Sequence, residues 1–183
     1  MLEAIKEIVI SEEDIQQKIK ELAAKINNDY SSEELIVICI LKGSLFFTSD
    51  IIRLLTMPVV VDYMAISSYG NATKSSGVVR ILKDIEEHIE GRHCLIIEDI
   101  VDTGLSAGYM KNILSLRNPK SLKICSLLDK KIMRINDIEV DYAGFVVPEK
   151  FLVGYGLDFR DKYRHIRDVV TLKEEVIGVS DKL

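Results

Sequence analysis

The chain has 183 residues, with 24 basic and 29 acidic side chains, a formal net charge of −5 and 48% apolar composition. These values fit one folded domain, and they exclude disordered, collagen-like and coiled-coil proteins. The acidic balance also argues against a general affinity for nucleic acid or for anionic membranes. Any phosphate-binding surface must therefore be concentrated at one site.

The sequence predicts neither a membrane span nor a secretory signal. Its longest purely apolar run, 35–41, is far shorter than the roughly 18 residues that a spanning helix needs. The N-terminus lacks the basic start and long apolar stretch of a signal peptide, so we expect a cytoplasmic protein. Cys39, Cys94 and Cys125 are widely separated in apolar runs, which predicts reduced thiols packed in the core rather than a metal site.

The predicted elements alternate between helices and strands. Ser11 and the acids at 12–14 are typical of a helix start, and apolar residues then recur at helical spacing from 15 to 26. Short apolar, β-branched runs predict buried strands at 35–41, 59–61, 94–97 and 122–128. Further helices are predicted at 45–55 and 105–116.

This alternation predicts an α/β fold, with a mainly parallel, twisted sheet flanked by helices. The sequence contains no internal repeat and no proline-rich linker, so we expect a single domain over residues 1–183. Sheets of this kind bind ligands at the carboxyl ends of their strands. The segments that follow the apolar runs are therefore where a site is expected.

The strongest signal follows the strand at 94–97, where Glu98-Asp99-Ile100-Val101-Asp102-Thr103-Gly104-Leu105-Ser106 precedes a helix. A helix N-terminus presents free N–H groups, so Thr103, Gly104 and Ser106 can hold a phosphate. Glu98 and Asp99 would repel a phosphate, but they suit a sugar cis-diol or a hydrated magnesium ion. The segment thus predicts a ribose phosphate site and matches no dinucleotide or P-loop pattern. Solvated acids before an ordinary helix cap are the alternative.

This segment resembles the 5-phosphoribosyl pyrophosphate-binding signature of the type I phosphoribosyltransferases, in particular their hypoxanthine-guanine subfamily. Further segments resemble the same family in the same order: Leu41-Lys42-Gly43-Ser44, Ser67-Ser68-Tyr69-Gly70, Ser126-Leu127-Leu128-Asp129-Lys130, and Phe151 to Asp158 with Arg164 after it. Together these segments cover about residues 35 to 168. The resemblance implies that family's fold, with a small hood formed by the N- and C-terminal segments.

The activity that the resemblance implies is Mg²⁺-dependent transfer of a phosphoribosyl group from 5-phosphoribosyl 1-pyrophosphate to N9 of a 6-oxopurine base. Hypoxanthine is the first expected base and guanine the second, giving IMP or GMP and pyrophosphate. Asp102 would accept the purine N7 proton as general base, with a helix N-cap as its alternative role. The implied metal ligands are Glu98, Asp99 and Asp158.

The resemblance also implies which residues hold each part of the substrates. The phosphoribosyl group is assigned to Glu98, Asp99, Thr103, Gly104, Leu105 and Ser106, the pyrophosphate to Lys42, Gly43, Ser68, Tyr69 and Arg164, and the purine to Lys130, Phe151, Leu152 and Asp158. In the family, a cis peptide bond precedes the lysine of the pyrophosphate turn. A solvated lysine in a helix-entry loop is the alternative reading of Lys42.

Lys130 would select the base because an ammonium group only donates hydrogen bonds. It therefore suits the carbonyl at position 6 of hypoxanthine and disfavours the amino group of adenine. Phe151 would stack on the purine, although it could equally be a core residue at a strand start. The small and polar residues of 67–77 suit a mobile lid, with a plain hairpin as the alternative.

Some family members have lysine and threonine where this chain has Leu105 and Ser106; Leu105 still leaves the backbone donors in place. One rival function is a nucleotide-sensing regulator with this fold and weak catalysis, which would need a basic surface for nucleic acid. Another is a magnesium-dependent phosphatase, which leaves the turn at Lys42 and the segment at Phe151 unexplained. The family's habit implies a homodimer or homotetramer without nucleic acid or membrane partners. His88, His93 and His165 form no metal or nucleophile pattern and are expected to be structural or at the surface.

Overall fold

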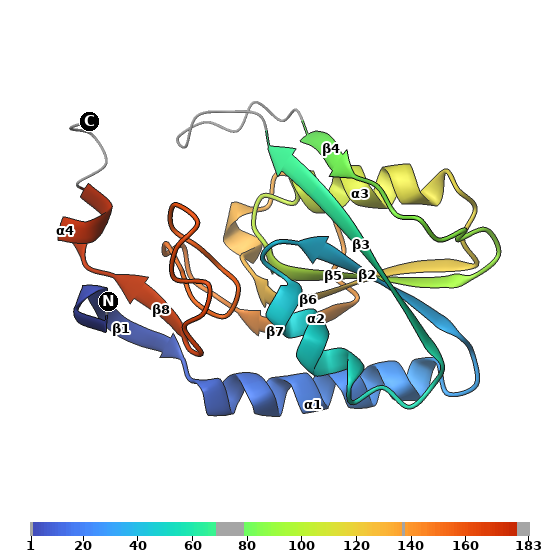
Figure 1. Cartoon of the computed structure of the whole chain (residues 1–183), viewed down its shortest axis with the longest axis horizontal. Coiled ribbons are helices and arrows are strands. Elements are labelled where there is room, and N and C mark those ends of the chain that lie inside the picture. Colours follow the sequence, from blue (N-terminus) through green and yellow to red (C-terminus); the bar gives the residue numbers. More distant parts are fainter. Residues whose placement is uncertain (1, 69–78, 137, 179–183) are drawn as a thin grey trace.

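The computed structural model describes residues 2–68, 79–136 and 138–178. A central six-stranded sheet has the strand order β4-β3-β2-β5-β6-β7, and a separate two-stranded sheet pairs β1 with β8 (Figure 1). The elements in chain order are η1 (Leu2–Ala4), β1 (Ile5–Ile10), α1 (Glu12–Asp29), β2 (Leu35–Leu41), α2 (Leu45–Ile52), β3 (Val59–Ser68), β4 (Val79–Lys83), β5 (His93–Val101), α3 (Leu105–Ser115), β6 (Ser121–Asp129), η2 (Lys131–Met133), β7 (Tyr142–Val146), β8 (Val169–Leu172) and α4 (Glu174–Ile177).

The central sheet is mainly parallel, as the sequence predicts. β2 pairs in parallel with β3 and β5, and β6 pairs in parallel with β5 and β7. The β3–β4 pair is antiparallel. Alternate residues of β2 enter two different hydrophobic clusters: Leu35 and Val37 pack with α1 and α2, whereas Ile36 and Ile38 pack with α3. Helices on both faces therefore explain why β2 is a continuous apolar run.

Helix α1 begins where its capping signal predicts. The Ser11 side chain accepts a hydrogen bond from the backbone N–H of Asp14 at 3.2 Å. The apolar residues at helical spacing are all buried: Ile15, Ile19, Leu22, Ala23 and Ile26. Among the helices of the described residues, none is long and apolar enough to cross a bilayer.

Three predicted strands are longer in the structure than expected, β6 by only one residue at each end. β3 continues to Ser68, and β5 continues through Glu98 and Asp99 to Val101. The apolar runs end at polar residues such as Asp62 and Glu98, so the apolar pattern alone did not predict that the strands continue. The terminal and edge strands β1, β4, β7 and β8 were not predicted, because their side chains are only partly buried or the strands are short. The helix predicted at 45–55 ends earlier, at Ile52.

The terminal segments form the hood that the family resemblance implies. β1 and β8 pair antiparallel, with Ile5 opposite Leu172. An isolated bridge between Val153 and Val170 attaches the 151–168 segment to β8. This segment, orange-red in Figure 1, lies between the small sheet and the central sheet. The hood thus holds the predicted purine-stacking segment over the edge of the main sheet.

Burial of the cysteines predicts their reactivity. All three are free thiols in the core, and burial raises the pKa of Cys94 to about 11 and raises the pKa of Cys125 as well. Because the thiolate is the nucleophile, a raised pKa leaves Cys94 and Cys125 protonated at pH 8. All three side chains are also buried, which keeps an alkylating reagent away from the sulfur atoms. We expect mass spectrometry to find the folded protein unmodified after iodoacetamide treatment at pH 8, and alkylated at all three cysteines in guanidinium chloride. Labelling of folded protein at the rate of a free cysteine would contradict this.

Candidate active site

The carboxyl ends of three parallel strands bring the predicted site residues to one edge of the sheet. Gly43 follows β2, Asp102 follows β5 and Lys130 follows β6, and these strands are neighbours in the order β2-β5-β6. The segment that contains Phe151 and Arg164 reaches the same edge from the hood (Figure 1). Residues that are up to about 120 positions apart in the sequence thus share one site.

The turn after β2 is closely packed on two sides. Its Leu41–Lys42 peptide bond is cis, as the family resemblance implies. A Cβ atom added to Gly43 would overlap the carboxylate of Asp99. On the other side, a Cβ atom added to Gly156 would overlap the carbonyl oxygen of Gly43, and Gly156 has a φ of 101°. Only glycine provides both the space and this backbone conformation. The sequence placed Gly156 in the segment from Phe151 to Asp158 but did not indicate this close contact with Gly43.

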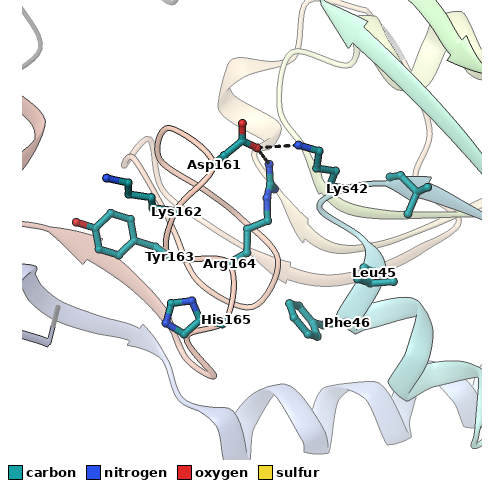
Figure 2. Close-up of a pocket in the computed structure, with 9 residues that line it drawn as sticks. Lys42, Leu45, Phe46, Asp161, Lys162, Tyr163, Arg164 and His165 are labelled. Atoms are coloured by element: carbon teal, nitrogen blue, oxygen red, sulfur yellow. Dashed lines mark hydrogen bonds and ion pairs between the residues drawn. The ribbon is translucent and has the colours of Figure 1, made fainter.

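The side chain of Lys42 is exposed and turns toward the hood segment. Its Nζ lies 3.0 Å from Oδ1 of Asp161, and the same oxygen lies 3.3 Å from Nη2 of Arg164. Figure 2 shows these two cationic side chains meeting at Asp161, above a cavity of about 500 Å³ that is bounded by Phe46 and His165. Sequence reasoning missed Asp161, because only the fold brings it opposite Lys42.

Arg164 is held by several acceptors at once. Nη1 donates to the carbonyl of Gly156 at 2.7 Å, and Nη2 lies 2.6 Å from Oδ1 of Asp158. The second oxygen of Asp158 accepts the backbone N–H of Asp161 at 2.7 Å. The predicted pyrophosphate residues Lys42, Gly43 and Arg164 are therefore brought together, and Asp158 is fixed beside them.

Glu98 and Asp99 point to opposite sides of β5, since successive strand residues alternate. Glu98 is 7% exposed and faces the segment that starts α3, whereas Asp99 packs against Gly43. Burial, and then the charge of Asp99, raise the pKa of Glu98 well above its ordinary value. Burial raises the pKa of Asp99 to about 6, although backbone N–H groups and Arg164 act in the opposite direction. Both carboxylates are thus short of compensating positive charge.

The start of α3 forms a small hollow suited to an anion. Gly104 occupies the N-cap position with a φ of 81°, and the N–H of Leu105 is 3.4 Å from the Thr103 hydroxyl oxygen. A cavity of about 90 Å³ is lined by Glu98, Ile100, Val101, Asp102, Thr103, Gly104, Ser106 and Ala107. The first N–H groups of a helix lack intrahelical partners and favour a phosphate at this position. The alternative role of Asp102 as the N-cap is wrong, since Gly104 holds that place.

Asp102 and Lys130 form an ion pair at the centre of this edge. Nζ of Lys130 is 3.3 Å from Oδ2 of Asp102, and the Lys130 side chain is only 13% exposed. The backbone N–H of Lys130 donates to the carbonyl of Val101 at 3.0 Å, which joins the two strand ends. Within the described chain, the buried Oδ1 atom of Asp102 accepts no hydrogen bond. The pair therefore places an ammonium donor beside a carboxylate whose side chain is 45% exposed.

The aromatic ring of Phe151 is available for stacking. It is 48% exposed and meets Phe159 edge-on, with ring centroids 5.6 Å apart and an interplanar angle of 83°. The alternative reading of Phe151 as a core residue is therefore wrong. The neighbouring Leu152 is buried.

Part of the predicted lid lies outside the described residues. Ser68 is the last residue of β3, and Tyr69 with the rest of the lid segment belongs to 69–78, which the structure does not describe. His93 is a structural residue, as expected: its Nδ1 is 2.6 Å from the Ser121 hydroxyl and its ring packs edge-on against Tyr30.

The carboxylates fit a magnesium ion that is shared with a substrate. In the described part of the chain, no three His, Cys, Asp or Glu side chains converge as an all-protein cage would require. Mg²⁺ is usually bound through one or two carboxylates, with waters and phosphate oxygens completing its shell. Asp99 suits this role, because its carboxylate is poorly compensated and lies beside the Gly43 turn. Asp158 already has both oxygens engaged by Arg164 and Asp161.

Comparisons with known proteins agree with this geometry. Residues 9–160 match the model of the phosphoribosyl transferase domain family. The hypoxanthine-guanine phosphoribosyltransferase of Bacillus subtilis is 45% identical over 94% of this chain and 96% of its own. A Staphylococcus aureus hypoxanthine phosphoribosyltransferase structure superposes with a TM-score of 0.91, at 44% identity and 94% coverage of both chains. The Trypanosoma cruzi enzyme, solved with its product IMP, has a TM-score of 0.89 at 42% identity and covers 95% of this chain and 97% of its own.

The close approach of Gly156 to Gly43 predicts a large effect of one methyl group. Gly156→Ala forces a Cβ atom onto a backbone carbonyl at a positive φ, so we expect a loss of about 2–4 kcal/mol of stability. For a chain of this size, that lowers the melting temperature by about 4–16 °C. Gly178→Ala is the matched control, since a Cβ there meets nothing within 4 Å. Thermal unfolding followed by circular dichroism measures both, and an unchanged Gly156→Ala protein would refute the packing described.

Proposed function

The chain belongs to the phosphoribosyl transferase family, and on that premise we propose that it transfers the 5-phosphoribosyl group from 5-phosphoribosyl 1-pyrophosphate to N9 of hypoxanthine or guanine. The products are IMP or GMP and pyrophosphate, and the activity is purine salvage. The B. subtilis relative, which matches this chain over nearly its full length, is named for this activity. The T. cruzi structure contains the product IMP.

The observation that carries the choice of base is the Asp102–Lys130 pair. In a 6-oxopurine, the O6 acceptor and the N7 position lie next to each other on one edge of the ring. An ammonium donor and a carboxylate acceptor 3.3 Å apart match that edge, with Lys130 donating to O6 and Asp102 accepting the N7 proton. Adenine presents an amino group at position 6, and the Lys130 ammonium cannot accept a hydrogen bond from it. The Asp102 side chain is 45% exposed, so its carboxylate is accessible to a ligand, which supports its role as the acceptor.

The other parts of the substrates are assigned around this pair. The 5-phosphate binds the N–H groups at the start of α3, with Thr103 and Ser106 adding hydroxyl groups. The pyrophosphate binds at the Lys42–Gly43 turn and Arg164, where positive charge and backbone groups stabilise the leaving group. Phe151 stacks on the purine. These roles rest on the family resemblance and on the meeting of the residues at one edge of the sheet.

We assign Mg²⁺ to the side of the site where Asp99 and Asp158 lie, with Glu98 facing the ribose. A bound Mg²⁺ supplies positive charge to the pyrophosphate oxygens. The protein's own residues do the rest: Asp102 takes up the N7 proton, Lys130 fixes the purine edge, and Arg164 holds the leaving group in place.

The rival functions are not favoured by these findings. A nucleotide-sensing regulator would not require the Asp102–Lys130 pair to match a purine edge, and the chain's net charge is −5.

The predicted cytoplasmic location is supported by three buried, free thiols, as expected in a reducing compartment. The homodimer or homotetramer stays a proposal from the family's habit.

Removing the proton acceptor is the most direct test of the reaction. Asp102→Asn keeps the shape of the side chain but cannot take up a proton, so we expect kcat with hypoxanthine to fall by about 10²–10⁴-fold. Pyrophosphate release from 5-phosphoribosyl 1-pyrophosphate with Mg²⁺ and hypoxanthine measures it, alongside the melting temperature of the variant. A folded Asp102→Asn protein with wild-type turnover would remove Asp102 from the mechanism.

The purine selector gives a separate prediction. Lys130→Gln introduces a carbonyl oxygen that can accept from the adenine amino group, so we expect the ratio of kcat/KM for hypoxanthine over adenine to fall roughly 10- to 100-fold. Lys131→Gln, in the exposed next residue, is the matched control and leaves the ratio unchanged. Selectivity that survives Lys130→Gln would mean that another group reads position 6.

A further inference from the structure

A buried ion pair outside the reacting centre connects two parts of the site. Nη2 of Arg134 donates to Oδ1 of Asp129, and the two side chains are only 14% and 2% exposed. Nη1 of Arg134 donates to the carbonyl of Ile138 at 2.8 Å. Removing one partner of a buried pair leaves an uncompensated charge, so such a pair holds its segments firmly in place. Arg134 thus joins the Ile138 carbonyl to the end of β6.

The first part that this pair holds is the purine selector. Asp129 is the last residue of β6 and immediately precedes Lys130. Its carbonyl accepts the backbone N–H of Val147 at 3.1 Å, and the N–H of Lys130 donates to Val101 at 3.0 Å. With its side chain also held by Arg134, Asp129 has little freedom to rotate. The direction in which Lys130 leaves the strand is therefore set by its neighbour.

The second part is the segment that starts α3. The carbonyl of Thr103 accepts hydrogen bonds from the N–H groups of Ile135 at 2.9 Å and Asn136 at 3.3 Å. Gly104 packs directly on the same segment: a Cβ atom there would lie 2.8 Å from Cδ of Arg134 and 2.8 Å from Cγ2 of Ile138. The guanidinium that holds Asp129 thus belongs to the side chain that supports Gly104.

We propose that Arg134 is a positioning residue that keeps Lys130 and the Thr103–Ser106 phosphate segment at a fixed separation, through Asp129 on one side and the Ile138 carbonyl on the other. This rests on the proposed function, in which Lys130 reads O6 and the start of α3 holds the 5-phosphate. Arg134 itself touches neither group of the substrate. Removing its guanidinium therefore weakens both the selection of the purine and the binding of the 5-phosphate.

Arg134→Met tests the proposal, because methionine keeps an unbranched side chain and removes the guanidinium. We expect the hypoxanthine-over-adenine ratio of kcat/KM to fall at least tenfold, and KM for 5-phosphoribosyl 1-pyrophosphate to rise at least fivefold. Partial unfolding alone lowers both purine rates equally and leaves their ratio unchanged. Lys131→Met removes an exposed cation from the same turn, and it changes neither quantity.

Two further variants separate positioning from stability. Asp129→Leu/Arg134→Met replaces the buried pair by apolar side chains, which often restores stability. We expect its melting temperature to recover toward wild type while the purine ratio stays low. Arg134→Lys provides one ammonium, which can reach Asp129 or the Ile138 carbonyl but not both in the same geometry, and it gives an intermediate ratio. A double variant that regains both the melting temperature and the wild-type ratio would overturn the proposal.

Hydrogen exchange tests the same positioning role of Arg134 without measuring activity. In Arg134→Met, we expect the amides of Ile135, Asn136 and Gly108, which donate to the carbonyls of Thr103 and Gly104, to exchange at least tenfold faster, with those of α1 unchanged. If the wild-type protein transferred no phosphoribosyl group, the proposed function would fail. Faster amide exchange in Arg134→Met would still support the positioning role of Arg134. Unchanged exchange at Ile135, Asn136 and Gly108 in the folded variant would contradict the positioning role, whatever the activity.

Discussion

Everything in this site depends on the burial of parallel strands on both faces. β2 and β5 run side by side in the middle of the sheet, covered by α1 and α2 on one face and α3 on the other. Helices covering both faces leave the carboxyl ends of the strands as the place where polar side chains can meet a ligand. The chain puts the Lys42–Gly43 turn, Asp102 and Lys130 directly after three of those ends. The chemistry then follows from what each strand end presents.

The strand ends present charges that are not balanced within the protein. Asp99 and Glu98 have raised pKa values because burial removes water from their carboxylates. Lys130 and Asp102 form an ion pair, but the buried Oδ1 atom of Asp102 has no hydrogen-bond partner among the described residues. Such arrangements cost stability in the free protein and are typical of sites that complete themselves with a ligand. A phosphorylated sugar, its cation and a purine edge supply the missing partners.

The sequence predicted the sheet, its helices and the segments of the site, because buried parallel strands are unbroken apolar runs and the site segments lie at their ends. It did not predict that β5 continues through Asp99, since charged residues in a strand look like a loop. It also did not predict that Asp161 meets Lys42 or that Arg134 holds Asp129. Those contacts join residues whose partners are set by the path of the chain in space, and residue type alone does not determine such pairs. Phe151 shows the same limit, because its exposure, which distinguishes stacking from core packing, is a property of the fold.

A crystal structure of the protein with IMP tests the central claim most directly. The account predicts that Nζ of Lys130 lies within about 3.2 Å of O6, that the Asp102 carboxyl group, which carries the proton taken from N7, lies within about 3.2 Å of N7, and that Phe151 covers the ring face. The 5-phosphate then occupies the hollow at the start of α3. A structure in which the purine binds elsewhere, with the Asp102–Lys130 pair still closed on itself, would contradict the account.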